Sequence, residues 1–178
     1  FYYFADNYNV PYGNLAEGRI KELVFSAFKK MEKLRPSAVV LACNTATAVC
    51  ARELRKMYPF PVVGVEPALR QAWELGGRAL VLATRATCQS AAFAALYEKY
   101  GGNAEVFACD ELAQKIERGI LSDELSAFAC GLPEGEYSSV VLGCTHYVFI
   151  KKYIERRYRC PVFDGMSGTA DHLADILG

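Results

Sequence analysis

A short pattern of residues occurs twice in the chain and limits the folds that it can adopt. The segment SAVVLACNT at positions 37–45 is echoed by SSVVLGCTH at positions 138–146. Each copy places an apolar run, typical of a strand buried on both faces, directly before a cysteine, two polar residues and an amphipathic stretch. The repeat therefore predicts two similar α/β lobes related by an approximate two-fold axis.

The rest of the chain continues this alternation, which is typical of α/β folds with mostly parallel sheets. Asn14 is expected to cap the first helix, with Glu17 completing a capping box. Short β-branched or aromatic runs predict strands at 2–5, 38–42, 62–65, 79–83, 104–107, 139–142 and 161–163. Amphipathic stretches predict helices at about 15–34, 44–57, 90–100, 111–119, 122–129 and 146–157.

The length of the chain suits either one domain or two small ones. Its 178 residues are 52% hydrophobic, which is enough to form a buried core. We expect a first lobe made of residues 1–64 plus 164–178 and a second lobe made of residues 65–163. The active site is then expected in the cleft between the two lobes.

The charge balance argues against several classes of partner. The chain has 20 basic and 20 acidic residues, so electrostatics give no reason to expect nucleic acid or an anionic membrane surface as a partner. Its apolar stretches are far shorter than the ~20 residues that a membrane-spanning helix needs. No export signal is recognisable, and we therefore expect a cytoplasmic protein.

The seven cysteines do not look like a disulfide framework or a metal site. Their number is odd, and they are scattered through a chain of moderate length. Neither CxxC nor HxxxH spacing occurs, so no metal is expected. Five of them are interpreted as small buried apolar residues: Cys50, Cys88, Cys109, Cys130 and Cys160.

Cys43 and Cys144 differ from the others because of their position after the repeated strands. Ligands of parallel α/β sheets bind at the carboxyl ends of strands. A helix that starts there offers N–H groups that favour bound carboxylates and lower the pKa of a thiol. The alternative is that both cysteines are simply small packing residues at strand ends, but the recurrence of the pattern favours a shared role.

Two thiols on opposite sides of a pocket suit the chemistry of racemisation. A racemase removes a proton from one face of a carbon and returns one to the other face, so one thiol acts as base while the other acts as acid. His146 is a candidate proton partner of Cys144, although its position fits a helix-capping or surface histidine equally well. Asn44, Thr45, Thr145 and the loops at 10–13 and 83–87 are candidate seats for a small anion.

Three segments resemble the signatures of the glutamate racemases, within the aspartate/glutamate racemase superfamily. They are VPYG at 10–13, ACNTA at 42–46 and LGCTHY at 142–147. The resemblance implies interconversion of L- and D-glutamate without an organic cofactor, which supplies D-glutamate for peptidoglycan and so for the cell wall and cell shape. It also implies no metal and is compatible with a homodimer.

The resemblance assigns roles to residues by matching position. Cys43 and Cys144 match the proton-transfer residues, with His146 beside the second thiol, and Glu117 matches an acidic residue that assists one side. The residues matched to the glutamate site are Tyr12, Gly13, Asn44, Thr45, Thr87, Thr145 and His146.

The chain also departs from the family pattern. The family begins with a strand and an Asp-Ser-Gly loop that assists substrate binding and deprotonation, whereas this chain begins at what resembles the second strand. Val148 stands where the family usually has proline. Three alternatives therefore stay open: an aspartate or hydantoin racemase or a related decarboxylase; a catalytically inactive, shortened homologue that keeps the pocket for binding or regulation; and a hydrolase that uses Cys144 as nucleophile with His146.

Overall fold

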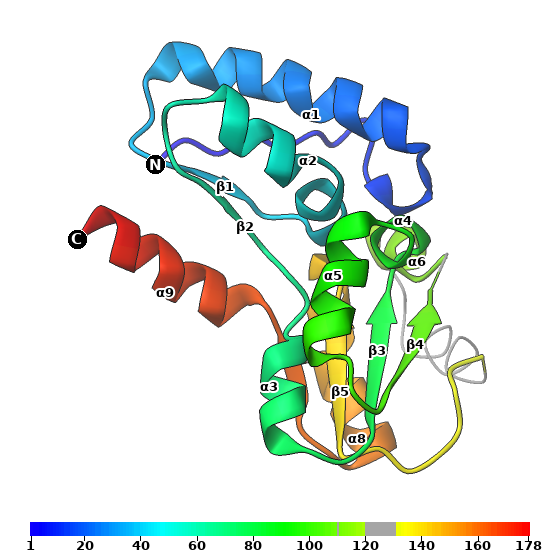
Figure 1. Cartoon of the computed structure of the whole chain (residues 1–178). Helices are drawn as coiled ribbons and strands as arrows, with labels where there is room; N and C mark the ends of the chain where they lie inside the picture. Colours follow the sequence, from blue (N-terminus) through cyan, green and yellow to red (C-terminus); the bar gives the residue numbers. More distant parts are fainter. Residues whose placement is uncertain (110, 120–130) are drawn as a thin grey trace.

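The computed structural model describes residues 1–109, 111–119 and 131–178, and its described strands form two separate parallel sheets (Figure 1). The smaller sheet pairs β1 with β2, and the larger sheet has the order β4-β3-β5-β6. Every strand pairing is parallel, which confirms the predicted α/β class. The strands are β1 (Val39–Leu41), β2 (Val62–Gly64), β3 (Ala79–Ala83), β4 (Ala104–Ala108), β5 (Ser139–Gly143) and β6 (Val162–Asp164).

Helices α1 (Glu17–Met31) and α2 (Asn44–Met57) lie on the same side of the smaller sheet (Figure 1). The spacing of Ile20, Val24 and Phe28 puts them on one face of α1, and all three are buried. They pack with residues of α2, β1 and β2 in one apolar cluster. After Met31 the chain tightens into the 3-10 turn η2 (Glu32–Leu34).

The larger sheet is covered on both faces because its central strands alternate their side chains between two clusters. Leu80 and Leu82 of β3 pack with α6 (Leu112–Glu117), η3 (Thr145–Ile150) and α8 (Lys151–Tyr158). Val81 packs on the opposite face with α3 (Leu69–Leu75) and α5 (Ala91–Tyr100). This two-sided burial explains why β3 and β5 are continuous apolar runs in the sequence.

The chain crosses between the two sheets twice, and the two crossings touch. The first runs from β2 to α3, and the second runs from β6 to α9 (Met166–Leu177). A Cβ atom on Gly165, in the second crossing, would collide with the carbonyl oxygen of Glu66, in the first. Helix α9 beyond this contact extends away from the larger sheet and has no buried residue (Figure 1).

Three predictions about local structure are wrong. Residues 1–6 are not a strand: no described strand pairs with them to satisfy their backbone groups, and Phe1, Tyr2 and Tyr3 are exposed. Asn14 does not cap α1, because it belongs to the 3-10 turn η1 (Tyr12–Asn14) and the cap position falls on Ala16. The stretch after Cys144 starts as the 3-10 segment η3 and becomes α-helical only at Lys151.

Burial of the cysteines agrees only in part with the sequence interpretation. Cys50 and Cys109 are buried, whereas Cys88 and Cys160 are only half-buried. Cys130 and the helix expected at 122–129 lie outside the described residues. Over the described ranges, no helix combines the length and the apolar character that crossing a membrane requires.

Candidate active site

Cys43 and Cys144 occupy equivalent positions at the carboxyl ends of β1 and β5. Each is the N-cap residue of the segment that follows, α2 for Cys43 and η3 for Cys144. Their backbones are nearly identical, with φ and ψ of −146° and 120° at Cys43 and −147° and 133° at Cys144. The repeated sequence therefore produces a repeated local structure up to and including the thiol, although the two helices that follow differ in type.

Burial controls the ionisation of both thiols. It raises the pKa of Cys43, although the backbone N–H groups of Thr45 and Ala46 and the Thr45 hydroxyl act in the opposite direction. Burial, followed by the charge of Cys43, raises the pKa of Cys144 to about 12. The expectation that the helix starts would lower both pKa values is thus wrong in its net sign. The charge of a Cys43 thiolate thus disfavours a second thiolate at Cys144.

Cys144 is the first member of a short polar chain that ends at Glu117. Its Sγ lies 3.7 Å from Nδ1 of His146, and Nε2 of the same ring lies 2.6 Å from Oε1 of Glu117. The His146 side chain is only 16% exposed, so it is not a surface histidine. A carboxylate on one ring nitrogen orients the imidazole and fixes which nitrogen faces the thiol. The arrangement can exchange a proton with Cys144.

Three buried threonine hydroxyls meet beside Cys43. Oγ1 of Thr45 lies 3.0 Å from Oγ1 of Thr84 and 3.3 Å from Oγ1 of Thr87, and the last two oxygens are 3.0 Å apart. The Thr84 oxygen also accepts a hydrogen bond from the backbone N–H of Thr87, so Thr84 caps α4 (Arg85–Cys88). Hydroxyls can rotate to donate to a carboxylate, which makes this cluster a candidate anion seat.

Thr84 was not among the residues singled out from the sequence, although the loop that contains it was. The available signal was its position: it follows the last residue of β3 and starts a helix, as Cys43 and Cys144 follow their own strands. The sequence did not show that the Thr84 hydroxyl would form a hydrogen bond with that of Thr45, because Thr45 lies in α2, which packs on the smaller sheet.

The remaining predicted residues surround the same region. A Cβ atom at Gly13 would lie 2.6 Å from Cγ2 of Thr84, so the η1 backbone packs directly on the threonine cluster. The Tyr12 hydroxyl donates to Asp6 at 2.7 Å, and Tyr12 packs with Cys43 against one apolar cluster. Asn44 is buried and donates to the Val65 carbonyl at 3.3 Å, while Thr145 is half-buried at the start of η3.

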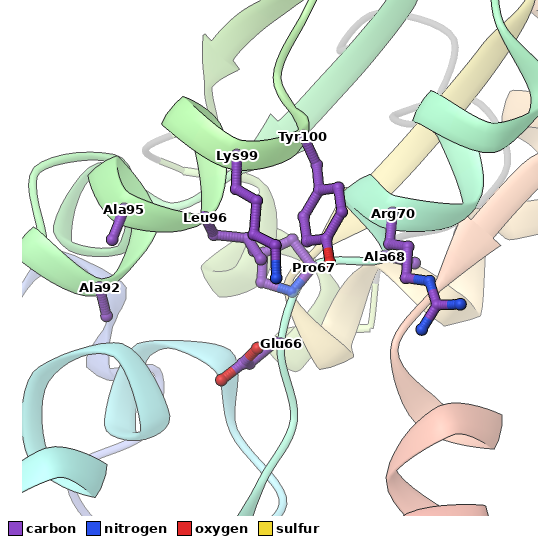
Figure 2. A pocket seen from close by; sticks show the side chains of 9 residues that line it. All are labelled: Glu66, Pro67, Ala68, Arg70, Ala92, Ala95, Leu96, Lys99 and Tyr100. Atoms are coloured by element: carbon purple, nitrogen blue, oxygen red, sulfur yellow. The ribbon is translucent and has the colours of Figure 1, made fainter.

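A separate hollow of the molecule does not include the two thiols in its wall. A cavity of about 490 Å³ opens between the first crossing, α3 and α5, and its wall includes Glu66, Arg70, Lys99 and Tyr100 (Figure 2). Neither Cys43, Cys144 nor His146 lines it, so this cavity is separate from the thiols of the candidate site. A smaller cavity of about 80 Å³ touches Asn44 and Thr87. We therefore place the candidate site by its thiols and not by cavity size.

Within residues 1–109, 111–119 and 131–178, no three side chains of His, Cys, Asp or Glu gather as a metal site requires.

Comparison with known proteins gives consistent matches along nearly the whole chain. The family model for Asp/Glu/Hydantoin racemase matches residues 14–173. A glutamate racemase of Clostridium acetobutylicum is 38% identical, covering 97% of this chain and 72% of that protein. A glutamate racemase of Bifidobacterium longum is 34% identical, covering 98% of this chain and 74% of that protein.

Solved structures agree with these relatives. A glutamate racemase isoform of Bacillus anthracis superposes with a TM-score of 0.83 at 27% identity, covering 97% of this chain and 70% of that one. The Escherichia coli glutamate racemase in complex with L-glutamate and the activator UDP-MurNAc-ala gives a TM-score of 0.80 at 28% identity, with coverage of 97% and 70%.

Proposed function

The chain belongs to the Asp/Glu/hydantoin racemase family, and we propose that it interconverts L- and D-glutamate by passing the Cα proton between the thiols of Cys43 and Cys144. The observation that supports this most is the equivalent placement of the two cysteines at the ends of β1 and β5. Burial raises the pKa of both thiols, and a Cys43 thiolate disfavours a thiolate at Cys144, which suits a reaction in which one cysteine is thiolate while the other is thiol.

The proposed reaction balances protons without another reactant. One cysteine, as thiolate, removes the Cα proton, and the resulting carbanion is protonated on the opposite face by the other cysteine, as thiol. The first cysteine ends as thiol and the second as thiolate, so the roles are exchanged for the other enantiomer. The ammonium group of the amino acid supplies the positive charge that offsets the burial of a thiolate.

His146 and Glu117 serve the Cys144 side in this scheme. The imidazole accepts or returns the Cys144 proton, and the Glu117 carboxylate stabilises the imidazolium that forms. On the Cys43 side, the N–H groups at the start of α2 and the Thr45 hydroxyl stabilise the thiolate. The chemistry proposed here needs thiols and an imidazole, and no organic cofactor.

Glutamate recognition is proposed to use the polar groups around the thiols. The hydroxyls of Thr45, Thr84, Thr87 and Thr145 and the free N–H groups at the helix starts suit the two substrate carboxylates. Glutamate is favoured over aspartate because the relatives at 38% and 34% identity are named glutamate racemases. We propose the lobes 1–64 with 164–178 and 65–163 as the two sides of this site, and peptidoglycan precursor supply as its role.

The experiment that tests the proposal follows solvent deuterium into Cα of each glutamate enantiomer. Cys43→Ala and Cys144→Ala are each expected to abolish racemisation of both enantiomers, because both thiols are needed for one turnover. Cys160→Ala is the matched control, since this half-buried thiol lies two residues before β6 and outside the site, and it should keep activity. Full turnover in either of the first two variants would contradict the two-thiol mechanism, and hydrolysis that needs Cys144 alone would favour the hydrolase alternative.

A further inference from the structure

The geometry points to Asp6 as a further positioning residue of this site, one that fixes Tyr12 and the η1 turn against Cys43. No sequence motif marked Asp6, and the inference rests on the proposed function only for its kinetic readout. Asp6 lies in the irregular segment before η1, directly after the residues 2–5 for which the sequence predicts a strand.

Asp6 collects hydrogen bonds from two residues that follow it. The Tyr12 hydroxyl donates to Oδ2 at 2.7 Å, and the Asn9 side-chain amide lies 2.9 Å and 3.0 Å from the two carboxylate oxygens. The Asn9 backbone N–H adds a bond of 3.3 Å to Oδ1. Burial acts to raise the pKa of Asp6, but the bonds from Tyr12 and Asn9 outweigh it and lower the pKa below its ordinary value. Asp6 is therefore a charged acceptor that folds the chain back on itself.

Tyr12 carries this constraint into the site. Its ring and Cys43 pack against the same apolar cluster of α1, α2 and the smaller sheet. Burial, the Asp6 carboxylate and the charge of Cys43 all raise the pKa of Tyr12, so its hydroxyl keeps its proton and acts only as a donor to Asp6. Tyr12 consequently offers its ring and backbone to the pocket and has no role in proton transfer.

The η1 turn is held at two points by this arrangement. Asp6 holds the Tyr12 side chain, and Thr84 contacts the Gly13 backbone so closely that no Cβ fits between them. Thr84 is itself bonded to Thr45, the second residue after Cys43. Losing the Asp6 contact frees the first point only, so the expected consequence is a looser wall beside Cys43 and not a loss of the fold.

On each side of the site, a carboxylate holds a second side chain in place, but only on the Cys144 side can that side chain exchange a proton with the thiol. Cys144 is backed by His146 and the Glu117 carboxylate, a chain that can move a proton. Cys43 packs against the same apolar cluster as Tyr12, whose hydroxyl the Asp6 carboxylate holds in place, an arrangement without a proton-transfer link to the thiol. This difference makes a specific prediction, because removing Asp6 should affect substrate binding more than the pH dependence of turnover.

The test compares Asp6→Ala, Asp6→Asn, Tyr12→Phe and the double variant Asp6→Ala with Tyr12→Phe. Losing this charge-assisted hydrogen bond should raise KM for both glutamate enantiomers about tenfold, with kcat changed much less. Asp6→Asn keeps an acceptor and should recover most of the affinity. Because both single changes remove the same bond, the double variant should be no worse than either alone. Glu53→Ala is the control, since it removes a half-exposed carboxylate paired with Lys21 outside the site.

A second readout does not depend on racemase activity. The rate at which iodoacetamide labels Cys43, followed by peptide mass spectrometry, should rise in Asp6→Ala and in Tyr12→Phe but not in Glu53→Ala. Unchanged labelling together with unchanged KM would overturn the role of Asp6, as would additive losses in the double variant. A wild-type protein that does not racemise glutamate would defeat the proposed function, and the labelling rates would still decide the role of Asp6.

Discussion

Replacing Gly13 with alanine tests whether η1 and the threonine cluster depend on one close contact. The added Cβ would lie 2.6 Å from Cγ2 and 2.7 Å from Cβ of Thr84, distances that real side chains do not tolerate. The Gly13 backbone is not in the left-handed region, so alanine meets a steric penalty and no conformational one. Thr84 cannot simply rotate away, because its hydroxyl is bonded to Thr45, to the Thr87 hydroxyl and to the Thr87 N–H.

The magnitude follows from the two ways in which the clash can be relieved. Overpacking of a tight contact costs about 1–3 kcal/mol, and rotating Thr84 instead loses hydrogen bonds worth about 0.5–1.5 kcal/mol each. We therefore expect Gly13→Ala to lower the free energy of unfolding by about 2 kcal/mol and to weaken glutamate binding, because either route displaces the candidate anion seat.

Urea unfolding followed by far-ultraviolet circular dichroism measures the first effect, and calorimetric titration with D-glutamate measures the second. Gly18→Ala is the matched control: Gly18 lies on the exposed face of α1, its Cβ would meet nothing, and the change should stabilise the protein by about 0.5–1 kcal/mol. The changes in the free energy of unfolding caused by the two alanine substitutions should therefore have opposite signs. Equal stability of both variants, or wild-type binding by Gly13→Ala, would refute the reasoning.

Two further predictions concern pH and charge. Burial, opposed by the charge of Lys21, raises the pKa of Cys50 to about 12. Above about pH 8.5 the unfolded chain therefore loses a proton that the folded chain keeps, and the free energy of unfolding falls as pH rises toward 12. Cys50→Ala should make this fall less steep in urea titrations, and an unchanged dependence on pH would count against the prediction. The Lys151 ammonium lies 2.9 Å from Oδ2 of Asp164, whose side chain is 15% exposed, so Lys151→Met should cost about 1 kcal/mol in low salt and less in 1 M NaCl, whereas a cost independent of salt would exclude a Coulombic origin.

The parts of the fold that sequence anticipated are those set by local pattern. The nearly continuous apolar runs at 79–83 and 139–142 fall on β3 and β5 to within a residue, because strands buried on both faces carry few polar positions. The motifs around Cys43 and Cys144 identified the racemase family, which the comparisons confirm. The repeat also located both cysteines at strand ends, because a strand followed by a helix start fixes the position of the residue between them.

What sequence missed depends on residues brought together by the fold. From its spacing alone His146 fits a surface histidine equally well, and only the family resemblance pointed to Glu117; the contact between the two side chains forms between different elements of the fold. The predicted direction of the thiol pKa shifts is wrong for a similar reason. Burial raises both pKa values, and the burial of a side chain depends on distant parts of the chain, not on its sequence neighbours. The run at 2–5 had strand-like composition, but strand formation needs a partner, and composition does not supply one.

The contact between Gly165 and Glu66 has a mechanical consequence. Both connections between the sheets meet at one point, where Gly165 contacts Glu66. They therefore act as a hinge, and the two sheets extend from it. A methyl group at the contact point would move the two connections apart only slightly, but the displacement would be larger in the parts of the sheets that lie far from that point. Alanine at position 165 is therefore expected to change how the two sheets sit relative to one another, and Cys43 and Cys144 end strands of different sheets.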